Sequence, residues 1–511
     1  MNVSYNFRRN IMHHSYQKIL ALLLAGLMLL SVVACGRADE GEKDTLPPKD
    51  SETLAEGETK DPNFTCDLPD NLNFGDTEVN IMHTEIAGRE DEMPSERLGR
   101  GTISDAVYER NLAVENQLGV KLSLVSRNND MEVDSTLQTM VRAGDSSVDI
   151  FTYASHAAIP TAISGHYLDL SRVQNVDTSK HYWIQDYNNI VTFTEQNMQF
   201  LATSPAALSM FRLTYFTIFN TELFKERKLT SLYQIVENGE WTLDYQYGLV
   251  ADSYVDGDGD GTFSEKDFYG YITSCFQTQD AHLMASGIRV AVRDENGNWI
   301  FNSEKLDAIA EMVEKVCALN TSPGTYMEPN DGIGVYHVID KFARKEGLMA
   351  TTIFLSLERR IEALTEITYG IVPMPKLTRE QPNYYSFVQD QVSSFGISAA
   401  VGNESRQAVL GAVMESIAYH SNEIVRPAYY DTALSLRFMQ DPQSRNMLDI
   451  MFETLSFDLG YYIGLGQVRE DMRSILPNSN PAVASKFKAW EKHAKNMLKK
   501  YAESLDQILK N

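Results

Sequence analysis

Residues 255–267, VDGDGDGTFSEKD, have the residue types and the spacing of a calcium-binding loop. Counting from Asp256, side-chain oxygens fall at positions 1, 3, 5, 9 and 12, and a backbone carbonyl falls at position 7. Gly261 occupies position 6, where the backbone must turn sharply. The expected calcium ligands are, in order, Asp256, Asp258, Asp260, Thr262 through its carbonyl, Ser264 and Asp267.

The surroundings of this loop indicate a structural Ca²⁺ rather than a calcium sensor. Sensor loops occur as pairs between helices, whereas this chain has one loop, and the residues after it, YGYITS, read as a strand. Position 12 is Asp267 where Glu is usual, which shortens the coordinating arm. The alternative is a solvated acidic turn that holds no metal.

The N-terminus has the pattern of a lipoprotein signal peptide. Basic residues precede an uncharged apolar run, residues 19–34, which is shorter than a bilayer span and ends directly before Cys35. We expect residues 1–34 to be removed and Cys35 to carry the lipid (palmitate among its acyl chains). An ordinary signal peptide with a chance cysteine, or a short membrane anchor, is the alternative. Residues 35–74 then form an acidic tether, since residues 36–62 carry nine acidic and four basic side chains and almost nothing apolar.

Composition places the rest of the chain among globular, exported proteins. The chain has 511 residues, 43% hydrophobic residues and a net charge of −25, which argues against nucleic acid as a partner. Export would permit disulfides, and Cys275 with Cys317 is the expected pair. Separate buried thiols are the open alternative.

Hydrophobic periodicity predicts alternating strands and helices. Residues 78–84 and the segment VKLSLVS read as strands around a helix that ends at Gly119, with Thr102 and Asp105 in a capping-box pattern at its start. A helix over 134–143 and a strand after the RAGDSS turn follow. Strand and helix patterns alternate again from YFTIFN to YGIVPMP, and the chain after about residue 403 is mainly helical. An α/β class with largely parallel sheets is expected.

Several segments together resemble the extracellular solute-binding proteins of ABC importers, in the maltose-binding-protein-like group. They are RNLAVENQLGVKL, MVRAGDSSVDIF, YFTIFNTELFKERKL, IVENGEWTLD, YGIVPMPKL and the helical segment that begins SNEIVRPAYY. Their order and spacing, from about 78 to 455, carry the resemblance rather than any one motif.

The resemblance implies a two-lobed periplasmic-binding-protein-like fold of type II. Lobe one would comprise residues 75–210 with 350–397, and lobe two residues 211–349 with 398–511. The chain would cross between the lobes about three times, near residues 210, 350 and 397, and the lobes would close on a solute by hinge bending.

The resemblance also implies a solute site between the lobes, on loops at strand ends. Aromatic rings there would face the C–H faces of sugar rings, and polar groups would bind hydroxyls. Each residue has the alternative of serving the core, Arg212 could mark a carboxylate-bearing solute, and Tyr182 or Trp183 could cap lobe one. The candidates are Glu85, Arg89, Tyr153, Ser155, His156, Trp183, Arg212, Phe276 and Phe354, with Thr84, Tyr182, Ser209 and Asp280 on the same loops.

The expected function is capture of a carbohydrate or oligosaccharide at the extracytoplasmic face of the cell membrane, and its delivery to an ABC permease. We expect a monomer, and no enzyme. A ligand-sensing subunit of a membrane signalling system, and a secreted carbohydrate-active enzyme with two carboxylates at a fixed separation, are the alternatives. No Gly-x-Ser-x-Gly, His-Glu-x-x-His or phosphate-binding glycine loop occurs in the sequence.

The lipid anchor can be tested directly. Cys35→Ala removes the sulfur that would carry the lipid, so the protein should be released from the membrane or stay unprocessed. Detergent-phase partitioning measures this, and partitioning that is the same for Cys35→Ala and wild type would contradict the anchor.

Overall fold

The computed structural model describes residues 66–86, 88–93, 101–193, 197–329, 334–435 and 442–510. The chain divides into two units, Met1–Thr59 and Lys60–Asn511, and all described residues belong to the second unit. The expected signal peptide, Cys35 and most of the expected tether lie outside the described residues. No helix in the described part of the chain is long and apolar enough to cross a membrane.

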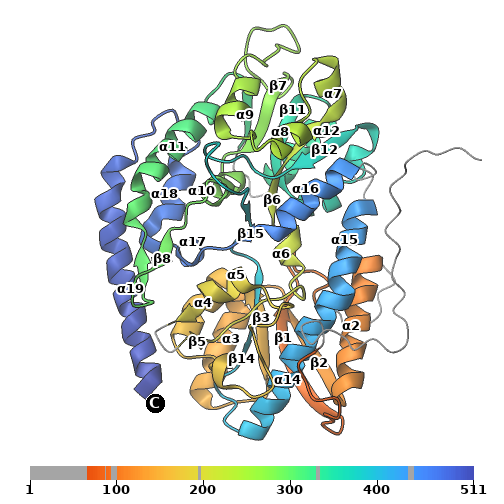
Figure 1. Cartoon of the computed structure of the whole chain (residues 1–511), viewed down its shortest axis with the longest axis vertical. Helices are drawn as coiled ribbons and strands as arrows, with labels where there is room; N and C mark the ends of the chain where they lie inside the picture. The colour runs from red at the N-terminus through yellow and green to blue at the C-terminus, as the bar shows by residue number, and fades with distance from the viewer. Residues whose placement is uncertain are drawn as a thin grey trace, which may run out of the picture. The chain divides into compact units, whose positions relative to one another are not determined.

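Two open sheets organise the second unit (Figure 1). The first has the strand order β14-β3-β1-β2, and the second has the order β10-β7-β11-β6-β12. The strands of the first are β1 (Thr77–Thr84), β2 (Val120–Arg127), β3 (Ile150–Ala154) and β14 (Ser393–Ile397). The strands of the second are β6 (Tyr215–Asn220), β7 (Tyr269–Ser274), β10 (Thr325–Glu328), β11 (Gly347–Ile353) and β12 (Tyr369–Val372).

Strand directions in both sheets are mixed. In the first sheet β1 is parallel to β2 and β3, while β14 is antiparallel to β3. In the second sheet β7 is parallel to β10 and β11, while β6 is antiparallel to β11 and β12. Three two-stranded sheets complete the pairing: β4 (Thr192–Phe193) with β5 (Met198–Gln199), β8 (Ala291–Arg293) with β9 (Trp299–Phe301), and β13 (Ser386–Phe387) with β15 (Leu455–Ser456).

Helices pack on both sheets, and the C-terminal part is mainly helical as predicted. The helices α2 (Thr102–Leu118), α3 (Asp130–Ala143) and α4 (Ser155–Ile163) pack against the first sheet, and α5 (Gln185–Ile190) packs against β15. The middle of the chain adds α6 (Ser209–Arg212), α7 (Thr221–Glu226), α8 (Leu232–Glu237), α9 (Leu243–Val250), α10 (Asp280–Ala285), α11 (Leu306–Asn320), α12 (Gly334–Ala343) and α13 (Phe354–Arg359). The last part adds α14 (Glu404–His420), α15 (Arg426–Ser435), α16 (Pro442–Glu453), α17 (Leu459–Tyr462), α18 (Val468–Ile475) and α19 (Phe487–Lys510).

Local sequence signals account for the ends of the first helices. Gly119 ends α2 in the left-handed conformation, with φ of 59°, as its position after the apolar face predicts. The predicted capping box is wrong, because α2 begins at Thr102 itself, with Gly101 as its N-cap and no side-chain cap. Asn129 caps α3 instead, by accepting a hydrogen bond from the Met131 N–H at 2.8 Å.

The expected lobe boundaries need correction. The resemblance implies that residues 350–397 belong to lobe one, but β11 and β12 within this range are hydrogen-bonded into the second sheet, where β6 pairs with both. Residues 398–511 were assigned to lobe two, but α14 packs against α2 beside the first sheet. The ordered part also begins before residue 75, since Leu68 is buried and the Lys180 ammonium lies 3.0 Å from the Asp67 carboxylate.

Two crossovers between the sheets run side by side. The chain leaves the first-sheet region through α6 and enters β6 at Tyr215, and it returns after β13 through residues 388–392 to β14. Thr214 and Val388 form an antiparallel bridge, and the Gln389 N–H donates to the Leu213 carbonyl at 3.1 Å. The chain crosses between the sheets a third time after α15, because α15 packs against α2 beside the first sheet and α16 packs against β12 of the second.

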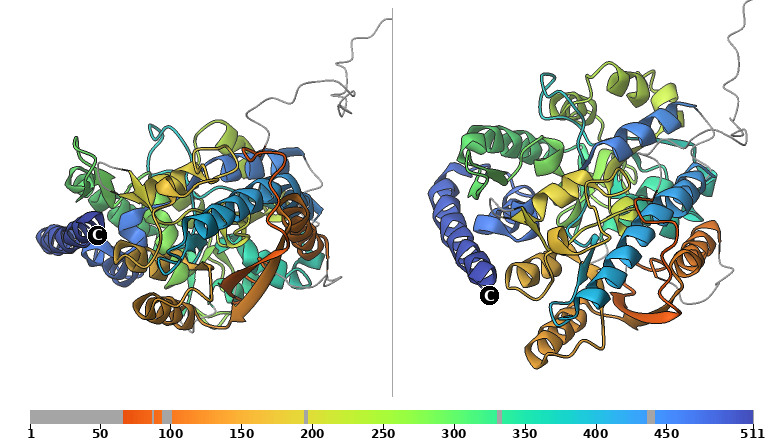
Figure 2. Two further views of the ribbon diagram at one scale, coloured as in Figure 1. Left: turned by 90° about the horizontal axis from the view of Figure 1, so that it is seen from below. Right: turned by 60° about the horizontal axis from the view of Figure 1, so that its bottom comes forward.

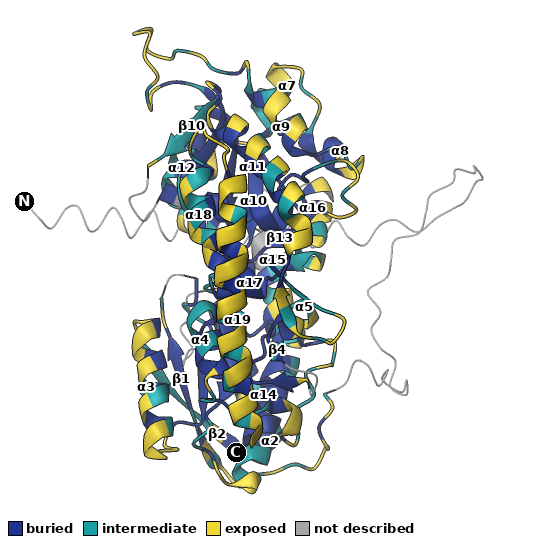
Figure 3. Ribbon diagram, turned by 90° about the vertical axis from the view of Figure 1, so that its left-hand side faces the viewer, coloured by how far each residue is buried: buried dark blue, intermediate teal, exposed yellow. Residues whose placement is uncertain are grey.

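Helix α19 connects distant parts of this unit (Figures 2 and 3). It packs against β9 and against α4 beside the first sheet. Trp490 near its start is buried, and its indole N–H donates to Asp471 at 2.6 Å. The outward face of the helix is exposed along its length, as Figure 3 shows.

No disulfide joins the three described cysteines, so the expected pair of Cys275 and Cys317 is wrong. The alternative of a separate buried thiol holds for Cys317, whereas Cys275 is half-buried. Cys317 is buried on α11, and its thiol donates to the Ile475 carbonyl at 3.6 Å. Burial raises the pKa of Cys317 to about 11, which keeps the thiol protonated and unreactive at neutral pH.

Candidate functional site

In each sheet, the carboxyl end of one parallel strand lies beside a crossover segment. In the first sheet, the end of β3 at Ala154 pairs with Ser393, where the return crossover arrives. In the second sheet, the end of β11 at Ile353 pairs with Tyr215, where the outgoing crossover arrives. Since the two crossovers are bridged to one another, these two edges face each other (Figure 1). Loops at such strand ends are the usual ligand-binding positions of open α/β sheets.

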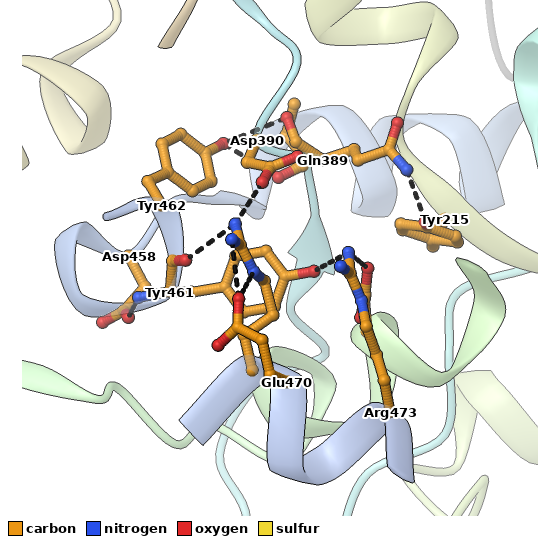
Figure 4. A network of polar contacts seen from close by, with 11 residues as sticks. Tyr215, Gln389, Asp390, Asp458, Tyr461, Tyr462, Glu470 and Arg473 are labelled. Atoms are coloured by element: carbon orange, nitrogen blue, oxygen red, sulfur yellow. Dashed lines mark hydrogen bonds and ion pairs between the residues drawn. The ribbon is translucent and has the colours of Figure 1, made fainter. Parts of the chain in front are cut away.

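Two arginines of α18 form ion pairs at this meeting place. Figure 4 shows the surrounding network, with Arg473, Asp390 and Tyr461 labelled. Arg469 donates to the Asp390 carboxylate at 2.5 Å, and Asp390 belongs to the return crossover. Arg473 binds both carboxylate oxygens of Asp280, at 2.7 and 2.5 Å, at the start of α10. Its guanidinium also donates to the Tyr461 hydroxyl at 3.3 Å. The network therefore joins the C-terminal part, the return crossover and the second lobe.

The arginine side chains remain partly open, whereas their carboxylate partners are more enclosed. Arg469 and Arg473 are 17% and 18% exposed, against 10% for Asp390 and 1% for Asp280. Burial alone would lower the pKa of Arg473, but the Asp280 carboxylate raises it, so the guanidinium stays charged. The cation also lies 4.4 Å from the centroid of the half-buried Phe276 ring. This edge thus presents fixed N–H donors beside an aromatic ring.

His156 brings the first sheet into the same region. It stands at the start of α4, directly after β3, and its backbone N–H donates to the Asp390 carbonyl at 3.0 Å. Its Nδ1 has no hydrogen-bond partner within the described part of the chain. Glu85 is exposed just after β1, at the same edge.

A second set of ion pairs ties the lobes together at the outgoing crossover. Arg212 lies 3.0 Å from Glu358 of α13 and donates to the Glu90 carbonyl at 2.5 Å. Arg359 pairs with the Glu90 carboxylate, and the Tyr429 hydroxyl donates to Glu358 at 2.8 Å. Arg212 is therefore satisfied by protein groups, and the structure gives it a connecting role rather than an open charge for a carboxylate solute.

Most of the aromatic candidates lie in the core, contrary to the expectation that their faces line the space between the lobes. Tyr153 is fully buried, and its hydroxyl donates to Asp134 at 2.8 Å. Trp183 is 2% exposed and donates to Glu415 of α14 at 3.0 Å, while Tyr182 donates to the same carboxylate. Phe354 packs on Phe216 with ring centroids 4.4 Å apart. Each ring completes the packing of its own lobe, which was the stated alternative.

Two polar candidates are also enclosed. Arg89 is fully buried, pairs with Asp130 at 2.6 Å and donates to the Gln391 carbonyl at 2.8 Å. Ser155 is fully buried and donates to the Val392 carbonyl at 2.7 Å. Both hold the end of the first sheet against the return crossover. Of the nine candidates, Glu85, His156 and Phe276 are the ones that remain accessible at the facing edges.

Arg469, Arg473 and Asp390 are not among the residues that the sequence predicts for the site. A signal for the arginines was present, because they are four residues apart in a segment expected to be mainly helical and would therefore share a helix face, as they do on α18. No sequence signal marks Asp390, because its contacts with Arg469 and His156 depend on where the return crossover lies in the fold.

The calcium loop lies elsewhere, at the opposite end of β7. The three side chains of Asp256, Asp258 and Asp260 bring one oxygen each to within 4.8 Å of one another. Asp256 accepts hydrogen bonds from the Gly259 and Gly261 N–H groups at 2.7 and 2.9 Å, which curls the loop around these carboxylates. Clustered carboxylate oxygens on a tight loop suit Ca²⁺.

Asp267, the expected ligand at position 12, is engaged by the loop itself. Its oxygens accept from the Gly257 and Ser264 N–H groups, at 2.9 and 2.7 Å. Burial would raise the pKa of Asp267, but these hydrogen bonds and that from Tyr254 lower it, so the carboxylate is ionised. Hydrogen bonds to Asp256 at the start of the loop and to Asp267 at its end therefore hold the loop in its turn.

Buried Trp183 gives a test of the core assignment. Trp183→Ala should lower the free energy of unfolding by about 3–5 kcal/mol, because it opens a cavity and leaves Glu415 short of a donor. Thermal melting of the ligand-free protein measures this, with half-buried Trp299→Ala as the matched control, for which a smaller loss is expected. An unchanged melting temperature for Trp183→Ala would place the ring outside the core.

No family model and no curated protein sequence matches the chain, but solved structures do. A sugar transporter from Rhizobium etli in an open conformation has a TM-score of 0.55 at 12% identity, over 82% of this chain and 99% of that one. RafE from Streptococcus pneumoniae in its apo form has a TM-score of 0.52 at 16% identity, over 83% and 98%.

The maltose/maltodextrin-binding domain MalE from Bdellovibrio bacteriovorus, bound to maltotriose, has a TM-score of 0.50 at 14% identity, over 83% of this chain and 100% of that one. At these identities the likeness concerns the fold. The fold that the sequence resemblance predicted is therefore confirmed: the chain has the two-lobed α/β fold of the maltose-binding-protein-like solute-binding proteins of ABC importers.

Proposed function

We propose that this chain is an extracytoplasmic solute-binding protein that captures a carbohydrate between its lobes and delivers it to an ABC permease. The observation that carries the proposal is the pair of facing strand edges, with Arg469, Arg473 and Phe276 on one side and His156 on the other. The proposal includes a lipid tether at Cys35, a monomeric state and no catalytic turnover.

The chemistry of the facing edges suits a neutral sugar. Asp280 holds the Arg473 guanidinium through Nε and Nη2, so the Nη1 N–H groups would be the donors to neighbouring hydroxyls of a sugar ring. Arg469 is engaged by Asp390, Glu470 and the Tyr461 carbonyl and would position this edge.

Phe276 offers a ring for the apolar C–H face. Glu85 would add an acceptor from the first lobe, and His156 would add a half-buried imidazole. The paired crossovers would serve as the hinge for closure.

The similar structures support a carbohydrate as the solute class. The MalE domain is bound to maltotriose, and a cyclo/maltodextrin-binding protein with a TM-score of 0.52 is complexed with maltotetraose. These ligands belong to those proteins. For this chain they guide the choice of the first solutes to be tested.

A variant at Phe276 tests the solute site. A thermal-shift screen with mono- and oligosaccharides, peptides and polyols should give a solute that stabilises the protein. Phe276→Ala should then weaken its binding by about 1–3 kcal/mol in calorimetry, the usual range for one aromatic anchor, with little change in melting temperature. Phe268→Ala is the matched control, because Phe268 is also half-buried and carries Arg227 at 4.2 Å, yet lies at the other end of β7.

Three outcomes would count against this function. Equal weakening by Phe276→Ala and Phe268→Ala would remove the facing edges as the site. Cleavage of the solute during the titration would favour the carbohydrate-active enzyme. Solute binding that changes the activity of a membrane kinase, without transport through a permease, would favour the sensor.

We also propose that the loop at residues 256–267 holds a structural Ca²⁺. Chelation by EDTA should lower the melting temperature of the wild type, because an ion that binds only the folded state stabilises it. Asp260→Ala, which removes one of the three clustered carboxylates, should make the protein insensitive to EDTA. Asp252→Ala, at an exposed position just before the loop, should keep wild-type sensitivity. Wild-type protein that is unaffected by EDTA and contains no metal by elemental analysis would contradict the site.

A further inference from the structure

The last helix concentrates positive charge in an otherwise acidic chain. Residues 481–511 contain seven lysines and three acidic residues, whereas the whole chain has a net charge of −25. Four of these lysines follow the spacing i, i+4, i+7 and i+11 on α19, which places them on one face of the helix in a row about 16 Å long. This lysine row consists of Lys488, Lys492, Lys495 and Lys499.

The packing of α19 fixes the direction in which the lysine row points. Trp490, Ala494 and Leu505 are buried on the opposite face of the helix. The Trp490 indole N–H also donates to the Asp471 carboxylate at 2.6 Å, which ties the start of α19 to α18. All four lysines of the row are exposed, and Figure 3 looks onto the outward face of this helix. The row therefore faces outward and cannot turn inward unless α19 unpacks.

The charges of the lysine row are not neutralised by the protein. Lys499 lies 3.8 Å from Glu503, but both side chains are more than half exposed, and such pairs contribute little. No described residue forms an ion pair with the other three lysines of the row. Residues 488–500 contain five lysines and one acidic residue, Glu491. Lysines three and four residues apart repel one another, so the row does not stabilise the helix, and the fold does not account for it.

The side chains around the row favour a lipid surface over a protein partner. Protein interfaces are centred on aromatic, Met or Arg side chains and are depleted in Lys. On α19, Leu509 is the one large hydrophobic residue that is exposed, and it lies in the last turn, beyond the row. A straight line of flexible ammonium groups instead suits a flat array of phosphate headgroups, which each lysine binds about fivefold more tightly than a neutral residue would.

We propose that the lysine row is a contact surface for the anionic phospholipid headgroups of a membrane. The axis of α19 would then lie along the membrane, because the row follows the helix. The rest of the chain is acidic and would be repelled by the same surface, so the row would also set the orientation of the protein. That a membrane is nearby rests on the proposed extracytoplasmic function, but contact with lipid does not depend on solute capture.

Quenching of a dye on α19 by vesicle lipid tests the proposal on the full chain. The four native cysteines are replaced by serine, and the dye is attached at Asn496→Cys, an exposed position beside the row. A headgroup-labelled lipid that quenches only at close contact is added to vesicles of phosphatidylcholine, with or without phosphatidylglycerol. Close contact is the readout because the apolar run at residues 19–34 could hold every variant on both kinds of vesicle.

The ratio of quenched to unquenched dye should be at least about fivefold higher with phosphatidylglycerol than without it. Replacing the four lysines of the row together by Gln should remove this difference. Gln is a good helix former and the positions are exposed, so the melting temperature should not change. The matched control replaces four exposed lysines outside α19 by Gln and should keep the difference: Lys121, Lys225, Lys228 and Lys305.

Salt should weaken the contact, because the screening length falls from about 10 Å at about 0.1 M to about 3 Å at about 1 M. Three results would overturn the proposal: equal quenching by the two kinds of vesicle, an equal effect of the two sets of Gln substitutions, or quenching that is unchanged at high salt. Loss of binding to the ABC permease in phosphatidylcholine vesicles, caused by the row substitutions, would also overturn it and assign the row to a protein partner. None of these results bears on solute capture, which Phe276→Ala reports separately.

Discussion

The two crossovers that pair at Thr214 and Val388 are the constraint on which the rest of the structure depends. Each ends at the edge of a sheet, one at Tyr215 and the other at Ser393, so their pairing decides which ends of the two sheets face each other. Any other arrangement would separate His156 from Asp390 and would leave the arginines of α18 without their partners. The proposed solute site depends on the pairing of these two connections, which brings the two strand edges together.

Electrostatic pairs then secure this arrangement on two sides. Arg212 joins the outgoing crossover to Glu358 of the second lobe, and Arg469 joins the C-terminal part to Asp390 of the return crossover. Partly buried pairs of this kind are costly to break singly, because the partner is left uncompensated. They join the lobes at two places, and in the proposed site the partly exposed Arg473 would be the donor to the solute.

Much of the fold was predictable from the sequence, because it rests on local signals. Alternation predicted β1, β6 and β7, and Gly119 predicted the end of α2. The predicted lobe boundaries were wrong at β11 and β12. These strands join the second sheet because they pair with β6, and such long-range pairing leaves no local signal in the sequence. The prediction of aromatic site residues was wrong for a related reason. Tyr153 and Trp183 lie in the expected segments, but whether a ring is buried in the core depends on tertiary packing. Arg469 and Arg473 are four residues apart, which places them on one face of a helix, but their partners Asp390 and Asp280 are distant in the sequence and are identified only by the structure.

The central claim, that the lobes close on a carbohydrate about the paired crossovers, is tested most directly by an interlobe distance. Spin labels at Thr139→Cys on α3 and Glu226→Cys on α7, both exposed, can be placed after the described cysteines are replaced by serine. Pulsed electron resonance then measures the distance between them with and without the carbohydrate that gives the largest thermal shift. The account predicts a shorter and narrower distance distribution with the sugar, and no cleavage of the sugar. An unchanged distribution at saturating sugar would contradict it.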